Sequence, residues 1–250
     1  MGNFRSRDDL QGGSRVVSVV VGYECSTAQE NASNPLASVN SVDFRWNYFS
    51  ADTGDTQDIW IDGAQMLGKK LKLKYELHYK ITDITANKEH DFEKVVIKPI
   101  YFPFQKKLGE KWGLKAAAGF DLVIDAGNDE KGIGSGSNQI APFFGFAFAH
   151  GPSGLVLIPL VQHFFDISGP DVSITAARII ALKPLGQKFW AKLDIKLPYD
   201  WKRDIWLPTA EIQIGYNINA TWAVYVDGFV GIGKNRLYDV EVGAGLRLKY

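Results

Sequence analysis

The sequence predicts an all-β protein, a transmembrane antiparallel up-and-down β-barrel of about 12 strands over residues 41–250. Apolar and polar residues alternate with a period of two in one segment after another, and only an extended strand separates such residues onto two faces. Short turns rich in Gly, Pro, Asn and Lys separate these segments. Aromatic residues gather where the segments end, which is typical of the interfacial girdles of membrane barrels.

The twelve predicted strands are, in chain order, Val42–Phe49, Gln57–Leu67, Leu71–Ile84, Phe92–Gln105, Trp112–Asp125, Gln139–Ala149, Leu155–Asp166, Val172–Leu182, Lys188–Leu197, Ile205–Ile218, Trp222–Val230 and Leu237–Tyr250. An even number of strands fits antiparallel closure with both chain ends on one side of the membrane.

The first three strands show the alternation in different degrees. The first turns Phe44 and Trp46 to one face and Asp43 and Arg45 to the other, whereas the second is less regular around Trp60. The third sets leucines and tyrosines against lysines, a glutamate and a histidine. One apolar and one charged face predict a wall with lipid outside and a wet lumen inside.

The fourth to seventh strands are less uniform. Pro99 and Pro103 predict bulges or a broken ladder in the fourth strand, because proline cannot donate to the ladder. The fifth strand sets Lys115 and Asp121 against an apolar face. The sixth and seventh strands are apolar on both faces, so the sequence leaves their inward side unresolved.

The last five strands return to the alternation. The eighth loses its register at Arg178, and the ninth sets Lys192, Asp194 and Lys196 opposite an apolar face. The tenth and eleventh each carry polar residues against isoleucines and valines, and the twelfth alternates without interruption up to Tyr250. All five are therefore expected to face lipid on one side and water on the other.

The connectors fall into two sets. The predicted periplasmic turns are Gly68–Lys69, Lys107–Lys111, His150–Gly154, Pro184–Gln187 and Asn219–Thr221, and the other set includes the predicted extracellular loops Thr85–Asp91 and Ala126–Asn138. The predicted girdle residues are Tyr48, Phe49, Tyr101, Phe104, Trp112, Tyr199, Trp201, Trp206, Tyr216, Trp222, Tyr238 and Tyr250.

The N-terminal 40 residues are expected to stand outside the barrel wall. Residues 1–28 combine early arginines, the apolar stretch 16–23 and small residues up to Ala28, which is typical of a secretion signal; a mis-started or unstructured leader is the alternative, since two aspartates are unusual there. Residues 29–40 are small, polar and proline-bearing and predict a tail that leads to the first strand, and the sequence leaves open whether this tail folds into the lumen.

The composition excludes several classes of protein. Lys plus Arg and Asp plus Glu number 28 each, so the net charge is zero and no nucleic-acid partner is expected. No apolar run approaches the roughly 20 residues of a membrane-spanning helix. The mean hydropathy of -0.11 fits a barrel that carries its charges inside. A single cysteine, Cys25, rules out a disulfide framework.

The candidate site is the set of charged residues on the predicted inward faces. The predicted pore-lining residues are Lys72, Lys74, Glu76, His78, Lys80, Lys94, Lys98, Lys115, Asp121, Lys192, Asp194, Glu211, Asp227, Asp239, Glu241 and Arg247. Lysines dominate strands three to five and carboxylates dominate strands ten to twelve, which predicts opposed arcs and a field across the lumen that selects polar solutes. Alternatively, these charges only pair with one another and stabilise a closed barrel.

Catalytic and metal sites have little support in the sequence. His78 is the one histidine on a clean inward face, and a lumenal charge network is the favoured interpretation over a catalytic role. The pattern of a histidine two residues before a serine, found in outer-membrane phospholipases, is absent. No metal site or cofactor is expected, and Gly132-Ile133-Gly134-Ser135-Gly136 lacks the strand-to-helix context of a phosphate cradle.

Several short motifs resemble a family of outer-membrane channels named for the MetA pathway of phenol degradation. They are Asn34-Pro35-Leu36-Ala37, Gly134-Ser135-Gly136 leading into Ala141-Pro142-Phe143, Gln162-His163-Phe164-Phe165, and Trp201 followed by Trp206-Leu207-Pro208. The resemblance implies a twelve-stranded monomeric channel for hydrophobic or aromatic small molecules, without catalytic residues. The lysine-rich third strand departs from that family and argues against a purely hydrophobic solute.

We therefore expect a monomeric channel in the bacterial outer membrane that contacts lipid and lipopolysaccharide outside and passes a small-molecule solute inside. A barrel enzyme acting on lipid or lipopolysaccharide is the first alternative, and a soluble β-barrel that binds a small molecule is the second.

Overall fold

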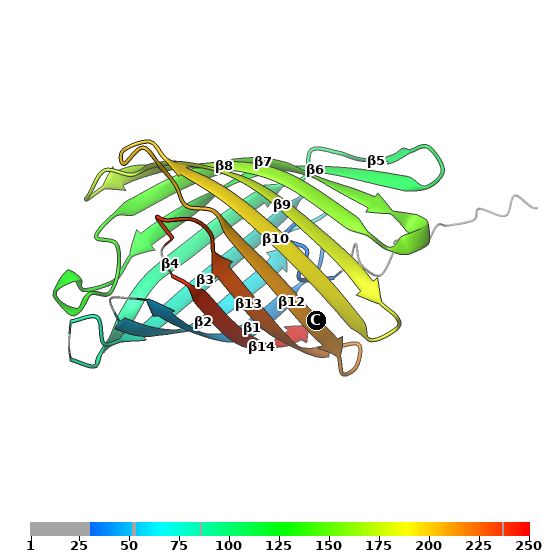
Figure 1. Ribbon diagram of the computed structural model, residues 1–250. Helices are drawn as coiled ribbons and strands as arrows, with labels where there is room; N and C mark the ends of the chain where they lie inside the picture. The colour runs from blue at the N-terminus through cyan, green and yellow to red at the C-terminus, as the bar shows by residue number, and fades with distance from the viewer. Residues whose placement is uncertain (1–30, 52–53, 86, 237) are drawn as a thin grey trace, which may run out of the picture.

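The computed structural model describes residues 31–51, 54–85, 87–236 and 238–250, so the predicted secretion signal lies outside the described residues. They form a closed antiparallel barrel of twelve wall strands, which confirms the predicted fold class (Figure 1). The wall strands are β1 (Ser41–Ala51), β2 (Gly54–Met66), β3 (Leu71–Thr82), β4 (Glu89–Tyr101), β6 (Trp112–Asp125), β7 (Asn138–His150), β8 (Val156–Ser168), β9 (Ser173–Leu185), β10 (Phe189–Asp200), β12 (Thr209–Asn217), β13 (Trp222–Gly231) and β14 (Val240–Lys249). Each of the twelve predicted strands overlaps one of them.

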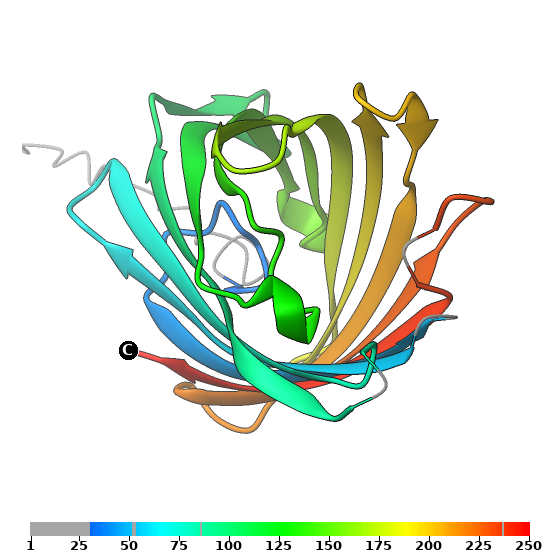
Figure 2. The ribbon, with the colours of Figure 1, turned by 90° about the vertical axis from the view of Figure 1, so that its left-hand side faces the viewer.

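Every wall strand pairs with its neighbours along the chain, and the barrel closes where β1 pairs with β14. This closing ladder runs from Ser41 opposite Lys249 to Ser50 opposite Val240. In the end view of Figure 2 the strands surround a central lumen. The short turns and the C-terminus lie at one end of the barrel and the longer loops lie at the other, which is the asymmetry expected between the periplasmic and extracellular ends of such barrels.

Prolines account for two short extra strands, β5 (Gln105–Leu108) and β11 (Ile205–Trp206). The ladder between β4 and β6 lacks the pairs next to Pro99, and the chain resumes its pairing with β6 as β5 only after Pro103. Pro208 likewise separates β11 from β12. The predicted broken ladder is confirmed, because proline has no N–H to contribute.

Apolar side chains dominate the outer face of the wall on every strand. In β3, Leu71, Tyr75 and Leu77 are 38%, 40% and 39% exposed, and no other layer of the described chain covers them. Contiguous apolar surface on this scale is not stable in water and fits hydrocarbon. Among the described residues, no helix is long and apolar enough to cross a membrane.

Aromatic side chains form bands near both ends of the outer face. Tyr101, Trp222 and Tyr250 are exposed at the short-turn end, and Trp201 and Trp206 are exposed at the long-loop end. Phe49 and Tyr238, two of the predicted girdle residues, do not belong to these bands. The alternation of β1 turns Phe49 inward, and Tyr238, in the loop before β14, lines the interior cavity with its ring 6.2 Å from that of Phe49.

The structure resolves which sides of β7 and β8 face inward. Ala147 of β7 and Ile158 of β8 are fully buried inside, whereas Phe144 and Val161 are exposed on the outer face. We call the interior face of β6–β9 the apolar arc, because its buried side chains are mainly apolar. Side chains of the apolar arc, among them Ile180 and Leu182, form a core cluster that also includes Trp190 of β10.

The described part of the N-terminal tail, residues 31–40, lies inside the barrel at the short-turn end (Figure 2). Asn34, Leu36 and Ala37 are each only 1% exposed. Leu36 packs into the core cluster, and the Asn34 side chain accepts a hydrogen bond from the backbone N–H of Leu36 at 2.8 Å. The tail therefore narrows the lumen from its short-turn end.

The longest loop, residues 126–137, is held at the opposite end. It includes the 3-10 turn η1 (Asp129–Lys131), and Ile133 within it is fully buried. The Lys131 ammonium donates to Asp91 at 2.7 Å, which fastens the loop to β4 and raises the pKa of Lys131 above its ordinary value. In Figure 2 this loop is seen in front of the lumen.

Candidate functional site

The candidate site is a charged cavity of about 380 Å³ inside the barrel, between the tail and the long-loop end. We call the interior face of β1–β4 and β10–β14 the charged arc. The residues that line the cavity are Ala32, Ser33, Pro35, Arg45, Asn47, Trp60, Asp62, Lys74, Glu76, His78, Lys98, Arg178, Lys192, Lys196, Glu211, Gln213, Phe229, Tyr238, Glu241 and Arg247.

All predicted pore-lining residues except Asp239 lie on the inward face of the wall. Their alternation with exposed apolar neighbours places them there, as in Lys192 and Asp194 beside the exposed Leu193. Asp239 lies in the loop before β14 and pairs with Arg236, with its side chain 56% exposed. The sequence pattern extended this strand to Leu237, whereas the structure begins it at Val240.

Apart from Lys72, the inward lysines of β3 and β4 pair with nearby carboxylates, so the predicted opposed arcs of charge are wrong. Lys74 pairs with Asp62 of β2 at 3.2 Å, and Lys98 pairs with Asp121 of β6 at 3.0 Å. Lys80 pairs with Glu93 at 2.6 Å. Glu93 is the extra residue of a bulge in β4, and this extra residue adds a carboxylate to the lumen.

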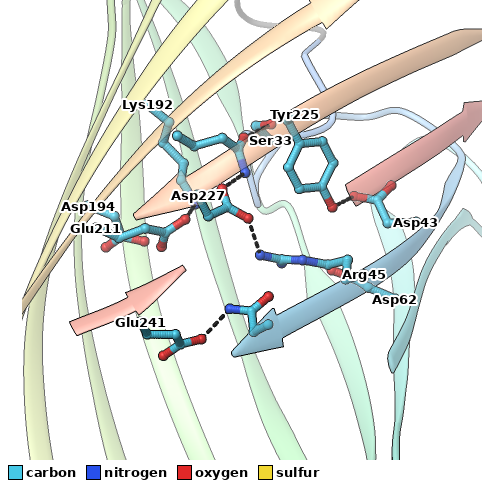
Figure 3. A network of polar contacts seen from close by, with 12 residues as sticks. Ser33, Asp43, Arg45, Asp62, Lys192, Asp194, Glu211, Tyr225, Asp227 and Glu241 are labelled. Atoms are coloured by element: carbon cyan, nitrogen blue, oxygen red, sulfur yellow. Dashed lines mark hydrogen bonds and ion pairs between the residues drawn. The ribbon is translucent and has the colours of Figure 1, made fainter. Parts of the chain in front are cut away.

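On the other side of the lumen, charges pair across strands β1 and β10–β14 (Figure 3). Arg45 donates to Asp227 at 3.0 Å, and Gln213 donates to the second carboxylate oxygen of Asp227 at 2.7 Å. Lys192 forms an ion pair with Glu211. Such pairs hold neighbouring strands in register while they keep the interior polar.

Arg247 and Asp43 form the most buried ion pair of the closing ladder. Their side chains are 6% and 4% exposed, and the Arg247 Nη2 donates to the Asp43 Oδ2 at 2.6 Å. Tyr225 donates to the same oxygen at 2.8 Å. Arg247 also donates to the Ser33 hydroxyl at 2.8 Å, and Ser33 in turn donates to Gln213 at 2.5 Å. This cluster attaches the tail to the charged arc.

Lys72 and Lys115 hold the tail rather than face the cavity. The Lys72 ammonium is nearly fully buried and donates to the carbonyl oxygen of Ala37 at 2.8 Å. The Lys115 ammonium donates to the carbonyl oxygen of Leu36 at 2.8 Å and stands over the Phe102 ring. Sequence patterns could not assign these contacts, because they require the tail to be inside the barrel.

Several cavity residues escaped the sequence-based prediction of the site. Trp60 and Asp62 line the cavity from one parity of β2, so the period-two signal was present, but Gly63 and Ala64 obscured it. Arg178 and Lys196 line the cavity from β9 and β10. Arg178 was missed because the alternation of the predicted eighth strand loses its register at that residue.

His78 lies among carboxylates. Its Nδ1 is 2.9 Å from Asp58, its Nε2 is 3.4 Å from Glu76, and its ring stacks on Trp60 with centroids 5.0 Å apart. Asp58, His78 and Glu93 have donor atoms within 4.8 Å of one another, a set that could hold a cation. Glu93 is already engaged by Lys80 and Lys94, however, and two ammonium groups oppose a metal ion there.

A histidine–serine contact occurs at the short-turn end. In the 3-10 turn η2 (Gly151–Ser153), the hydroxyl of the exposed Ser153 lies 2.8 Å from the Nδ1 of the half-buried His150. A hydrolase would also need a group that orients the histidine and donors for an oxyanion. Within the described chain, His150 makes no hydrogen bond to a carboxylate.

Comparisons of sequence give no match, either to a family model or to a curated protein. Among solved structures, the chain is similar to an outer-membrane channel from Pseudomonas putida F1, with a TM-score of 0.61 and 6% identity over 85% of this chain and 96% of that one. It is also similar to the KdgM porin, with a TM-score of 0.55 and 11% identity over 84% of this chain and 99% of that one.

An enzyme shares the fold as well: outer membrane phospholipase A from Escherichia coli, with a TM-score of 0.50 and 14% identity over 88% of this chain and 95% of that one. At these identities the similarity shows the fold alone. The fold is that of bacterial outer-membrane proteins, so the predicted outer-membrane location is confirmed at the level of the fold.

Proposed function

We propose that the protein is an outer-membrane channel for the passive passage of small molecules, bathed outside by outer-membrane lipid and lipopolysaccharide and acting as a monomer. The observation that carries the proposal is the charged, water-accessible cavity inside a closed wall whose outer face is apolar on every strand. Such a wall isolates the lumen from hydrocarbon and leaves an aqueous route along the barrel axis.

The solute is expected to be small, because the tail occupies the short-turn end of the lumen. Leu36 is buried against the apolar arc, and Ser33 is bonded to the charged arc, so the tail spans the lumen. The apolar arc supports a solute with an aromatic or hydrophobic part, as the resemblance to channels of phenol degradation implies. The charged arc supports a polar group on the same solute.

The similar folds favour a channel without deciding its solute. Two of the three similar structures named above are a channel and a porin, and the KdgM porin has also been solved in complex with disordered oligogalacturonate. The enzyme alternative has weaker support, because the recorded hydrogen bonds of His78 run only to carboxylates, which provide no nucleophilic hydroxyl or thiol.

Purified protein should test the proposal in a planar bilayer. Folded protein, identified by a heat-modifiable shift on a detergent gel, should produce discrete conductance steps, and heat-unfolded protein from the same preparation should produce none. Folded protein that inserts into the bilayer and conducts no ions would contradict the channel. A lipid-hydrolysis assay of the same sample addresses the enzyme, which a lack of hydrolysis would exclude.

A further inference from the structure

Arg178 and Lys196 are two cations directly opposite each other on β9 and β10. Like charges in this cross-strand arrangement repel, so the pair costs stability unless something lies between or beside them. Both side chains line the cavity. A local violation of a pairing rule inside a cavity is typical of a functional position.

The carboxylates around this pair are engaged by other groups. Arg178 donates through Nε to Asp194 at 2.8 Å and through Nη2 to the second oxygen of the same carboxylate. Glu211 is held by Lys192, and Glu241 accepts a hydrogen bond from Asn47. Among the ion pairs of the described residues, none within 4.0 Å includes Lys196. Its ammonium is therefore not held by one carboxylate and can donate to a group in the cavity.

The exposed fractions of the ion-paired side chains also show that cations face the cavity. The Arg178 side chain is 26% exposed while its partner Asp194 is 0% exposed, and Arg45 is 16% exposed while Asp227 is 0% exposed. Long basic side chains thus cover the carboxylates of the wall here. Water and solutes in the cavity meet ammonium and guanidinium groups first, although the interior carries both signs of charge.

The residues next to Arg178 indicate what kind of molecule would fit this part of the cavity. On its β8 side Arg178 pairs with Leu160, which packs against the core cluster of the apolar arc, and on its β10 side it pairs with Lys196. Arg178 therefore marks the boundary between the two arcs. A molecule with an anionic group beside an apolar body is complementary to such a boundary.

We infer that Lys196, beside Arg178, binds the carboxylate of a small organic acid that passes through the lumen with its apolar part towards β8. This inference rests on the proposed channel and names the class of its solute. Lys196 makes the charge-assisted contact, and Arg178, positioned by Asp194, adds the second positive charge. Glu211 of β12 and Glu241 of β14, which line the same cavity, limit how many anions it holds at once.

A gradient of potassium benzoate across a planar bilayer tests the inference, since the reversal potential gives the permeability of benzoate relative to potassium. Lys196→Gln should lower that ratio by roughly fivefold, because a focused charge in a narrow lumen raises the local concentration of its counter-ion. Lys196→Arg should retain it. Lys183→Gln, on the exposed outer side of β9, is the matched control and should also retain it.

Each outcome decides one question. A folded, conducting Lys196→Gln variant with the ratio of the wild type overturns the benzoate site and leaves the channel in place. The site is supported if Lys196→Gln lowers the permeability of benzoate relative to potassium and Lys196→Arg keeps the wild-type value. A folded wild type without any conductance overturns the channel and this inference together.

Discussion

The charged arc and the apolar arc are two solutions to the same problem, the filling of a barrel interior. The charged arc pairs cations with carboxylates and leaves a cavity, whereas the apolar arc packs side chains against one another and against Leu36. Ion pairs keep their geometry and remain hydrated, so they can border an open space. Apolar side chains gain stability by excluding water, so they close the space. The difference suggests that the charged arc provides the route and the apolar arc provides much of the rigidity.

The largest effect is expected in the charged arc, from Arg247→Ala. The substitution leaves the Asp43 carboxylate buried without its cation and should lower the free energy of unfolding by about 3–5 kcal/mol. Urea titration of protein reconstituted in liposomes, followed by tryptophan fluorescence, measures the change. Lys202→Ala, which removes an exposed pair with Asp171, is the control and should leave the free energy unchanged. Equal losses in both variants would show that burial of the pair is unimportant.

Ile180→Ala tests the apolar arc. Ile180 is fully buried in the core cluster, and the cavity left by the substitution should cost about 2–4 kcal/mol of unfolding free energy in the same titration. Ile179→Ala is the matched control on the outer face, where Ile179 is 56% exposed and lipid can fill the space. A loss at Ile179 as large as that at Ile180 would contradict a packed interior on this side.

Lys72→Met combined with Lys115→Met tests the tail, which touches both arcs. The carbonyl oxygens of Leu36 and Ala37 would lose their donors, at a cost of about 1–3 kcal/mol, and a released tail should raise the single-channel conductance. Lys70→Met, on an exposed lysine of the adjacent turn, is the control and should conduct like the wild type. Unchanged conductance in the double variant would mean that the tail does not restrict the lumen.

The wall could be predicted from the sequence because each strand is a local pattern. Alternation alone located β3 and β14, and Pro99 marked the broken ladder of β4, since both signals depend on neighbours in the chain. β7 and β8 were found as strands, but their facing was not, because an apolar interior and a lipid exterior require the same residue types. Only the closure of the barrel decides between those two sides.

The site was predictable residue by residue but not pair by pair. The inward parity of Lys98 and Asp227 followed from alternation, whereas their partners Asp121 and Arg45 depend on strand register, which the alternation does not fix. The predicted separation of charges failed for this reason. The contacts of Lys115 with the tail likewise depend on a segment that lies far away in the sequence.

The closing ladder between β1 and β14 has a consequence for how the protein reaches its membrane. Neighbouring hairpins along the wall can form from local contacts, but this ladder joins segments about 200 residues apart, and long-range closure is entropically costly and slow. Until it forms, β1 and β14 each present a row of unsatisfied backbone groups that hydrocarbon does not accept. Insertion therefore has to keep two open strand edges away from hydrocarbon until this ladder has formed.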